Sequence, residues 1–461
     1  MRLDLTAAVL WKRRRLRSRE RWSRAELDAH RARSLAVLVD FAVARSPYWK
    51  RVLGGRTDVP LSQIPPLTKA TLMDGFDDVV TDRSLRRADV EAFLASGSEG
   101  LFHGRYWVSA TSGSSGRRSI IPSSLGEWST TIASYARANE WAGIHLRVTG
   151  RTTMAVVSST TPSHQSARVG AAVKSSFLPT RRFDAGGLLD DTVRGLNEQQ
   201  PEILVAYASM LRILADEQIA GRLVIHPRAV NCSSEPLTRE ARERTRAAWG
   251  VEPFDVYAST ETAGIAAECE QHDGLHIFED LVIPEVVDDD YRPVAPGATG
   301  SRLLVTVLSS RTLPLLRYEL TDRIRTFASD AGCPCGRTLM RIAGIEGRTD
   351  DVLFMRGSAG DVAVHPVVFH TVLDPLPISA WQVRQEGDAL HVLLARPHAT
   401  IDAADLTRHI AADVARTGAI APCIQLDVVD AVPPGAAGKR PRIVADRSRR
   451  PQGPYEVQHA G

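Results

Sequence analysis

The chain has 461 residues, and its 57 lysine and arginine residues against 54 aspartate and glutamate residues give a formal net charge of +3 at pH 7. A charge this small provides no global field that would require nucleic acid or an anionic membrane as partner. Hydrophobic residues at 43% and charged residues at 24% exclude a collagen-like, coiled-coil or largely disordered chain. The length exceeds what one core usually serves, so we expect a large domain and a smaller one.

The N-terminal segment, residues 1–100, is expected to be mainly helical. Apolar residues recur at helical spacing in SLAVLVDFAVARSPYW, and Thr68 in QIPPLTKATL can cap a new helix. The basic stretch WKRRRLRSRERWSR alternates with apolar and acidic residues, which favours a solvated helix face. No segment resembles a signal peptide or approaches the ~18 apolar residues of a membrane span, so we expect a cytoplasmic protein.

From Tyr106 to about residue 351, short apolar runs alternate with helical stretches. The runs are TTMAVVSS, EILVAYAS, RLVIHPRAVNCSS, PFDVYAS and RLLVTVLSS, and the helices are expected at SMLRILADEQIA and TREARERTRAAWG. This alternation predicts an α/β domain with mixed, substantially parallel sheets.

The remaining chain predicts a compact α+β unit. VLFMRG, ALHVLLARP and IQLDVVD are typical of strands, and DAADLTRHIAADVART is typical of a helix. We therefore predict a large domain over residues 1–350, a small domain over 351–446 and a loose polar tail over 447–461.

A Ser/Thr/Gly cluster lies between two apolar runs in YWVSATSGSSGRRSIIP, residues 106–122. Glycines allow backbone N–H groups to turn toward an anion, and hydroxyl groups add donors for phosphate oxygens. The segment is not a Walker A motif, because Gly116 is followed by Arg117 rather than Lys. Taken alone, it fits a phosphate-binding loop and a surface turn equally well.

Further motifs follow this segment: NCSSEPL at 231–237, YASTE at 257–261, RYELTD at 317–322, GRTDD at 347–351 and GKRPR at 438–442. Their order resembles that of the adenylate-forming ligases, the superfamily of acyl- and aryl-CoA synthetases, peptide-synthetase adenylation domains and luciferase. ECEQHDGLHIFED at 268–280 is similar to the phenylacetate-CoA ligase branch. The ordered set resembles that branch over roughly residues 35–445. It implies a large AMP-binding domain and a small mobile lid domain.

The resemblance implies which residues contact ATP. The phosphate contacts would be Thr111, Ser112, Gly113, Ser114, Ser115 and Gly116, and the other nucleotide contacts Ser234, Glu235, Pro236, Tyr257, Asp322 and Arg348. Tyr257 would stack on adenine, and Asp322 would accept hydrogen bonds from the ribose hydroxyls.

The resemblance also implies the chemistry. A substrate carboxylate would attack the α-phosphorus of ATP and release pyrophosphate, while Lys439, the catalytic lysine, and Mg²⁺ held by Glu261 offset the developing charge. Thr260 would reach the α-phosphate. The small domain would then rotate about a hinge at Asp350, and a nucleophile, usually the CoA thiol, would displace AMP.

The acceptor stays open, because the chain departs from the family after the hinge. Arg356 and Gly357 are kept, but Ala363 and His365 stand where the family has Asn and Phe. That region helps to build the site of the second half-reaction. The acceptor is therefore CoA, a carrier-protein phosphopantetheine or an amine.

The acyl pocket is expected around 158–170 and 207–210, with candidates His164, Tyr207 and Ser259. The resemblance implies an aromatic acid. A catalytically idle nucleotide-binding protein is the alternative from another class, but it has no physical need for both a metal ligand and a mobile lysine. We expect no nucleic-acid or membrane partner, and both a monomer and a homodimer stay open.

Cysteine usage predicts a metal site. Five cysteines in a long chain without an export signal argue against a disulfide scaffold. Cys269, His276, Cys333 and Cys335 offer four ligands of the kind that suits tetrahedral Zn²⁺. We predict structural zinc here. Reduced cysteines beside a surface histidine are the alternative, because C-x-C spacing is weaker evidence than paired C-x-x-C motifs.

Overall fold

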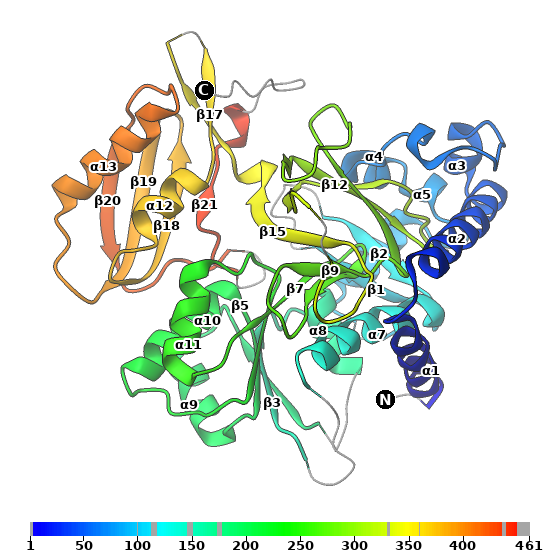
Figure 1. Ribbon diagram of the computed structural model, residues 1–461, viewed down its shortest axis with the longest axis horizontal. Coiled ribbons are helices and arrows are strands. Elements are labelled where there is room, and N and C mark those ends of the chain that lie inside the picture. The colour runs from blue at the N-terminus through cyan, green and yellow to red at the C-terminus, as the bar shows by residue number, and fades with distance from the viewer. Residues whose placement is uncertain are drawn as a thin grey trace.

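The structure is a computed structural model that describes residues 3–98, 100–111, 118–144, 151–172, 178–329, 332–358, 360–435 and 439–449. Helices open the chain, as predicted (Figure 1): α1 (Leu3–Arg19), α2 (Arg24–Arg45), α3 (Pro47–Val52), α4 (Lys69–Asp74), α5 (Phe76–Val79) and α6 (Arg87–Ala95). Thr68 caps α4 by accepting a hydrogen bond from the Thr71 amide at 3.1 Å, which confirms the predicted helix start. None of these or the later described helices is both long and apolar enough to cross a membrane. The cytoplasmic location stays a prediction.

A ten-stranded mixed sheet forms the centre of the fold, in the order β11-β14-β15-β9-β8-β7-β6-β5-β3-β4. Its members are β3 (Met154–Ser158), β4 (Thr180–Asp184), β5 (Ile203–Tyr207), β6 (Ala229–Ser233), β7 (Phe254–Ser259), β8 (Ala263–Glu268), β9 (Leu275–Ile277), β11 (Thr299–Gly300), β14 (Asp322–Thr326) and β15 (Arg341–Arg348). β4, β3, β5, β6 and β7 pair in parallel, and the others pair antiparallel. The predicted mixed, substantially parallel sheet is thereby confirmed.

Helices cover both faces of the parallel part. On one face, Ala155, Val157, Leu204, Ala206 and Val230 share an apolar core with α9 (Leu189–Gln199) and α10 (Ala208–Ile219), and α11 (Arg239–Trp249) packs beside α10. The other face is covered by α7 (Leu125–Trp141) and α8 (Gln165–Ala172). Because strand residues alternate between faces, this second face carries the residues that build the site.

Two smaller sheets complete this part of the chain. β1 (Trp107–Ala110) and β2 (Ile120–Ser123) form a hairpin, and β10 (Val282–Val287), β12 (Arg302–Val307) and β13 (Tyr318–Leu320) form an antiparallel sheet. RLLVTVLSS is therefore a strand outside the parallel sheet. In RLVIHPRAVNCSS only Ala229–Ser233 is a strand, so the prediction of strand structure in RLVIH was wrong.

Residues 352–449, the small region, have their own core around Trp381, Phe369 and Ile410. β16 (Leu353–Arg356) pairs with β17 (Asp361–Val364), and a four-stranded sheet has the order β20-β19-β18-β21. Its strands are β18 (Ile378–Glu386), β19 (Ala389–Pro397), β20 (Cys423–Val429) and β21 (Ile443–Val444), beside α12 (Val367–Leu373) and α13 (Ala403–Arg416). The α+β character is confirmed, whereas the domain boundaries and the mobility stay predictions.

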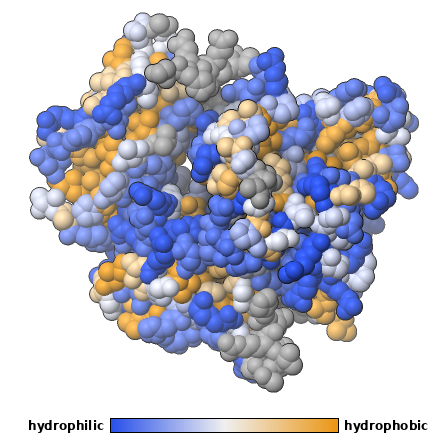
Figure 2. Space-filling model, viewed as in Figure 1, coloured by the Kyte–Doolittle hydropathy of each residue, from blue (hydrophilic) through white to orange (hydrophobic). Residues whose placement is uncertain are grey.

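The small region lies beside α10 and α11 (Figure 1). Viewed from the same direction, hydrophilic residues dominate the middle of the molecular surface (Figure 2). The connection runs through the short 3-10 turn Thr349–Asp351, which contains Asp350, the predicted hinge residue. The predicted loose tail begins in another 3-10 turn, Arg447–Arg449, and its remainder lies outside the described residues.

Candidate active site

A cavity of about 730 Å³ runs along one face of the parallel strands and reaches their carboxyl ends, where α/β sheets usually bind ligands. Alternate residues of neighbouring strands face it, as the two-residue period of a strand requires. They are Met154, Val156 and Ser158 of β3, Thr180 and Arg182 of β4, Val205 and Tyr207 of β5, Asn231 and Ser233 of β6, and Val256 and Ala258 of β7.

The cavity gathers most of the predicted site residues from distant segments of the chain. It is lined by Thr111, His164, Tyr207, Ser234, Ser259, Thr260, Glu261, Asp322, Arg348 and Lys439. Ser112, Gly113, Ser114, Ser115 and Gly116 lie outside the described residues. Glu235 and Pro236 are absent from the described lining, although Glu235 accepts a hydrogen bond from the Ser209 amide at 2.8 Å beside it.

Asp322 is held by two neighbours. The Tyr257 hydroxyl donates to its Oδ2 at 2.7 Å, and Arg348 Nε donates to its Oδ1 at 3.0 Å. Arg348 is the cross-strand partner of Asp322 between β14 and β15, so the sheet register creates the pair. The Asp322 carboxylate raises the pKa of Arg348 above its usual range, which keeps the guanidinium charged.

Tyr257 contacts Asp322 from the apolar core. Its ring is buried in the main apolar core and is absent from the described lining of the cavity. Burial, and next the Asp322 carboxylate, raise the pKa of its hydroxyl, which therefore stays protonated as a donor. The stacking on adenine stays a prediction, and the observed contact shows that the Tyr257 hydroxyl positions Asp322.

Lys439 reaches the cavity from the small region. Its Nζ donates to the carbonyl oxygen of Ser234 at 3.0 Å and lies 5.8 Å from the ring centroid of Tyr207. Ser234 has a φ of 72°, which places this non-glycine residue in the left-handed region. Burial, and next the Arg348 guanidinium, lower the pKa of Lys439. A lysine on one part of the chain is thus held directly over a site built by the other.

Glu261 and Thr260 are each held by a hydrogen bond from another part of the chain. The Tyr318 hydroxyl donates to Glu261 Oε1 at 3.0 Å, and Gln165 Nε2 donates to the Thr260 carbonyl oxygen at 3.0 Å. Within the described chain Glu261 has only this neutral hydroxyl partner and no ion pair. A carboxylate that is not committed to an ion pair is a suitable oxygen ligand for Mg²⁺ here.

His164 lines the cavity as a neutral group. Its Nδ1 lies 2.6 Å from the Ser159 hydroxyl, and burial lowers its pKa to about 4, with a further contribution from Arg118. The Tyr207 hydroxyl in turn accepts a hydrogen bond from the Ser159 amide at 2.9 Å. His164 therefore serves as a polar contact, not as a cation for a substrate carboxylate.

Several lining residues escaped prediction. Lys69 donates to Thr111 Oγ1 at 3.3 Å, and Tyr318 supports Glu261. Helix α1 contributes Thr6, Val9, Leu10 and Arg13. Tyr318 lies within the RYELTD motif, which could have indicated it, but nothing in the local sequence marks Lys69 or α1.

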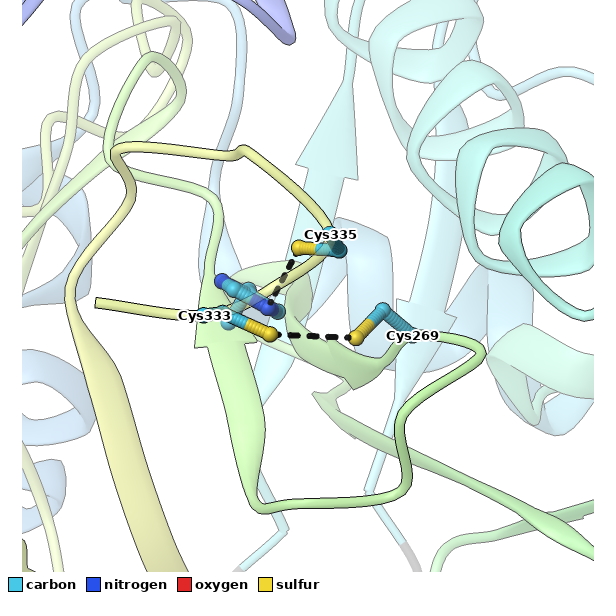
Figure 3. Close-up of side chains that lie close together, drawn as sticks. Cys269, Cys333 and Cys335 are labelled. Carbon is cyan, nitrogen blue, oxygen red and sulfur yellow. Dashed lines mark hydrogen bonds between the residues drawn. The ribbon is translucent and has the colours of Figure 1, made fainter. Parts of the chain in front are cut away.

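The predicted zinc ligands are not among the described residues that line the cavity, and Figure 3 shows Cys269, Cys333 and Cys335 close together. The ligand atoms of Cys269, His276, Cys333 and Cys335 all lie within 4.8 Å of one another. The sulfur atoms of Cys269 and Cys333 are 3.7 Å apart, and Cys335 Sγ is 3.4 Å from His276 Nε2. Burial lowers the pKa of His276 to about 4, so its ring is neutral and able to bind a metal.

Sequence comparison finds relatives, although no family profile matches the chain. The phenylacetate-coenzyme A ligase of Thermus thermophilus is 33% identical over 215 residues, 44% of this chain and 46% of that protein. The phenylacetate-coenzyme A ligase of Aromatoleum evansii is 30% identical over 181 residues, 38% of this chain and 40% of that protein. The matched part thus spans less than half the length of these curated relatives.

Structural comparison covers nearly the whole chain. A crystal structure of 2-hydroxyisobutyryl-CoA ligase in the postadenylation state has a TM-score of 0.71 and 18% identity, over 93% of this chain and 92% of that one. At this identity the likeness concerns the fold. The chain therefore has the fold of the adenylate-forming ligases, and its similarity to phenylacetate-coenzyme A ligases confirms the resemblance predicted from its motifs.

Proposed function

We propose that the protein is an AMP-forming acid–thiol ligase, which activates a carboxylic acid with ATP and then passes the acyl group to a thiol such as CoA. The observation that supports this most strongly is the position of Lys439. It extends from the small region into the cavity that Asp322, Glu261 and Thr260 line. Adenylation requires a cation that can move, here Lys439, and a carboxylate that binds the metal ion, here Glu261. It also requires a group that accepts hydrogen bonds from the ribose hydroxyls, here Asp322.

In the proposed first half-reaction, a carboxylate oxygen of the acid forms a bond to the α-phosphorus of ATP. The bond between that phosphorus and the bridging oxygen breaks, and pyrophosphate leaves. Lys439 donates hydrogen bonds to the oxygens on which charge develops, and Thr260 contacts the α-phosphate. Asp322, held by Tyr257 and Arg348, accepts from the ribose hydroxyls.

Glu261 would hold Mg²⁺, which neutralises phosphate charge when bound. The Tyr318 hydroxyl orients this carboxylate, and Gln165 fixes the preceding residue. The contribution of the chain is therefore to present one oriented carboxylate oxygen in the turn that follows β7.

In the proposed second half-reaction, the acceptor thiol loses its proton and its sulfur attacks the acyl carbon. The bond from this carbon to the AMP oxygen breaks, which gives a thioester and AMP. Lys439 must leave Ser234 to make room, so the small region rotates about the turn that contains Asp350. CoA is the favoured thiol because it is named in the sequence relatives and in the structural neighbour.

We also propose a structural zinc ion on Cys269, His276, Cys333 and Cys335. The convergence of four ligand atoms from β9, the end of β8 and a distant turn fits tetrahedral Zn²⁺. The ion would tie the turn at 333–335 to the central sheet. It is not assigned a catalytic part.

Pyrophosphate release with ATP and Mg²⁺, measured across aryl and alkyl carboxylic acids with and without CoA, tests the proposed function. We expect release that needs a particular acid, and formation of the matching acyl-CoA when CoA is present. Lys439→Ala serves as the inactive control. ATP binding without pyrophosphate release for any acid would favour the catalytically idle protein instead.

A further inference from the structure

Arg182 is a cation in the wall of the cavity. It lies on β4, the edge strand of the sheet, and its register partner is Val156 on β3. Both residues line the cavity, together with the apolar side chains of Ile144, Met154 and Val205. A guanidinium group therefore stands in a wall that is otherwise largely apolar.

The guanidinium of Arg182 is held in place by the protein backbone and by a hydroxyl. Its Nη2 donates to the Ser158 hydroxyl at 3.0 Å and to the Ser159 carbonyl oxygen at 3.2 Å. On the other side it lies against Gly170 of α8, where a Cβ atom would meet Nη1 at 2.0 Å. Any larger residue at 170 would displace the guanidinium group, so glycine at this position leaves the space that Arg182 occupies.

Charge compensation is missing at Arg182. Within the described part of the chain it forms no ion pair with an acidic residue, and burial lowers its pKa. Glu140, an acidic residue that also lines the cavity, is already paired with Arg13 and with Arg17, the latter at 3.0 Å. A partly buried cation without a counter-charge is unfavourable, and an anion that enters with the substrate lowers this cost.

Arg182 is also connected to the reacting end of the cavity. Ser159, whose carbonyl oxygen accepts from Arg182, donates its amide to the Tyr207 hydroxyl at 2.9 Å. The ammonium group of Lys439 lies over the ring of Tyr207. Two cations, Lys439 and Arg182, are thus separated by Tyr207 and Ser159 within one cavity.

We propose that the acid carries a second anionic group, a carboxylate in the simplest case, which binds Arg182 while the first carboxylate is activated beside Lys439. The substrate class is then a dicarboxylic acid with an apolar body. Arg182 is the specificity-determining residue, because a planar guanidinium offers paired donors to a carboxylate. This inference rests on the proposed function, since it concerns the acid that the same site activates.

Matched pairs of acids test the inference in the full-length enzyme. Each pair consists of a diacid and its neutral isostere, such as carboxyphenylacetic and methylphenylacetic acids, or adipic and hexanoic acids. We expect a kcat/KM for pyrophosphate release at least tenfold higher for a diacid than for its isostere. Arg182→Met should abolish this preference, mainly through KM, and Arg182→Lys should restore part of it.

Arg181→Met is the matched control. Arg181 is the preceding residue on β4, faces away from the cavity and pairs with Glu198 at 3.2 Å. The Arg181→Met variant should keep the preference for diacids over their isosteres. Equal kcat/KM for diacids and isosteres in the unaltered enzyme, or an unchanged ratio in Arg182→Met, would overturn the assignment.

Calorimetric binding of the diacids separates this inference from the proposed function. Diacid binding that Arg182→Met abolishes, without any pyrophosphate release, would uphold the site and reject the ligase. Release with simple monoacids alone would uphold the ligase and reject the site. If no diacid binds or reacts, the assignment of Arg182 is wrong.

Discussion

Arg212 on α10 donates through Nη1 to the carbonyl oxygen of Ser379 on β18 at 2.6 Å and so joins the two parts of the chain. Its Nη2 donates to the carbonyl oxygen of Ile378 at 2.7 Å, and its side chain is almost completely buried. Around it, Glu217 pairs with Arg396 at 3.3 Å. Polar contacts such as these can be exchanged for water, so the interface is suited to the rotation that the proposed second half-reaction requires.

Arg212→Ala should therefore weaken the contact between α10 and the small region. Loss of a buried, hydrogen-bonded charge at an interface typically costs about 2–5 kcal/mol, and Lys439 would reach the cavity less often. We expect pyrophosphate release to fall at least about tenfold, with a smaller effect on acyl transfer from preformed adenylate. Arg239→Ala on α11, whose side chain is 90% exposed, is the control and should change neither rate.

Lys439→Ala should separate the two half-reactions more sharply. Removal of a preorganised charge from a transition state typically costs about 10²–10³-fold in rate, so adenylation should fall by that factor. Transfer from chemically prepared acyl adenylate should stay within a few-fold of the unaltered enzyme. Single-turnover measurements of both steps check this expectation. Equal losses in the two steps would contradict the role assigned to Lys439.

Purified protein should contain about one zinc ion per chain, as the four-ligand cluster requires. Cys333→Ser should lower the zinc content measured by mass spectrometry and lower Tm, because the metal ties a turn to the sheet. Cys423→Ser changes an exposed cysteine on β20 and should leave both unchanged. A protein that is free of zinc and keeps its Tm after chelation would refute the metal site.

Asp255 on β7 should make stability depend on pH. Burial, and next Glu268, raise its pKa from 3.8 to about 7, so the folded state binds the proton more tightly than the unfolded state. Its contribution is fully present below pH 4 and is lost as the pH rises through about 7. The free energy of unfolding should therefore decrease over this window, by about 4 kcal/mol at most from this group.

Denaturant unfolding at several pH values compares the unaltered protein with Asp255→Asn, in which the titrating group is absent. The variant should show a flatter pH dependence between pH 4 and 8. Asp290→Asn, at an exposed aspartate, is the control and should follow the unaltered protein. Identical slopes for all three proteins would show that Asp255 does not titrate in this range.

The predicted elements were those with a clear local pattern. β3, β5 and β7 are short apolar runs, and α10 and α13 have helical periodicity. β18 was missed because its buried positions include glutamines: Gln382 donates to the Pro441 carbonyl oxygen and Gln385 to that of Phe354. A buried amide that is satisfied by a distant backbone cannot be distinguished from an exposed one in the sequence.

In the site, too, residues within clear local motifs were predicted and residues that depend on distant contacts were missed. Ordered motifs predicted Lys439, Asp322 and Glu261, and all three line one cavity. Arg182 was missed because its neighbours Arg181 and Asp184 are exposed, so β4 has the composition of a surface segment. Its proposed role in acid binding depends on the parallel pairing with β3, a contact that local sequence does not encode.

Helix α1 has a consequence for how the acid pocket of the proposed ligase can diversify. Val9 and Leu10 line the cavity, and Arg13 binds Glu140 of α7 beside them. These positions lie far along the chain from the nucleotide motifs. Changes in the first helix can therefore reshape the space for the acid while the residues that handle ATP stay constant, which makes the N-terminus a natural place to exchange when the substrate range is to be redirected.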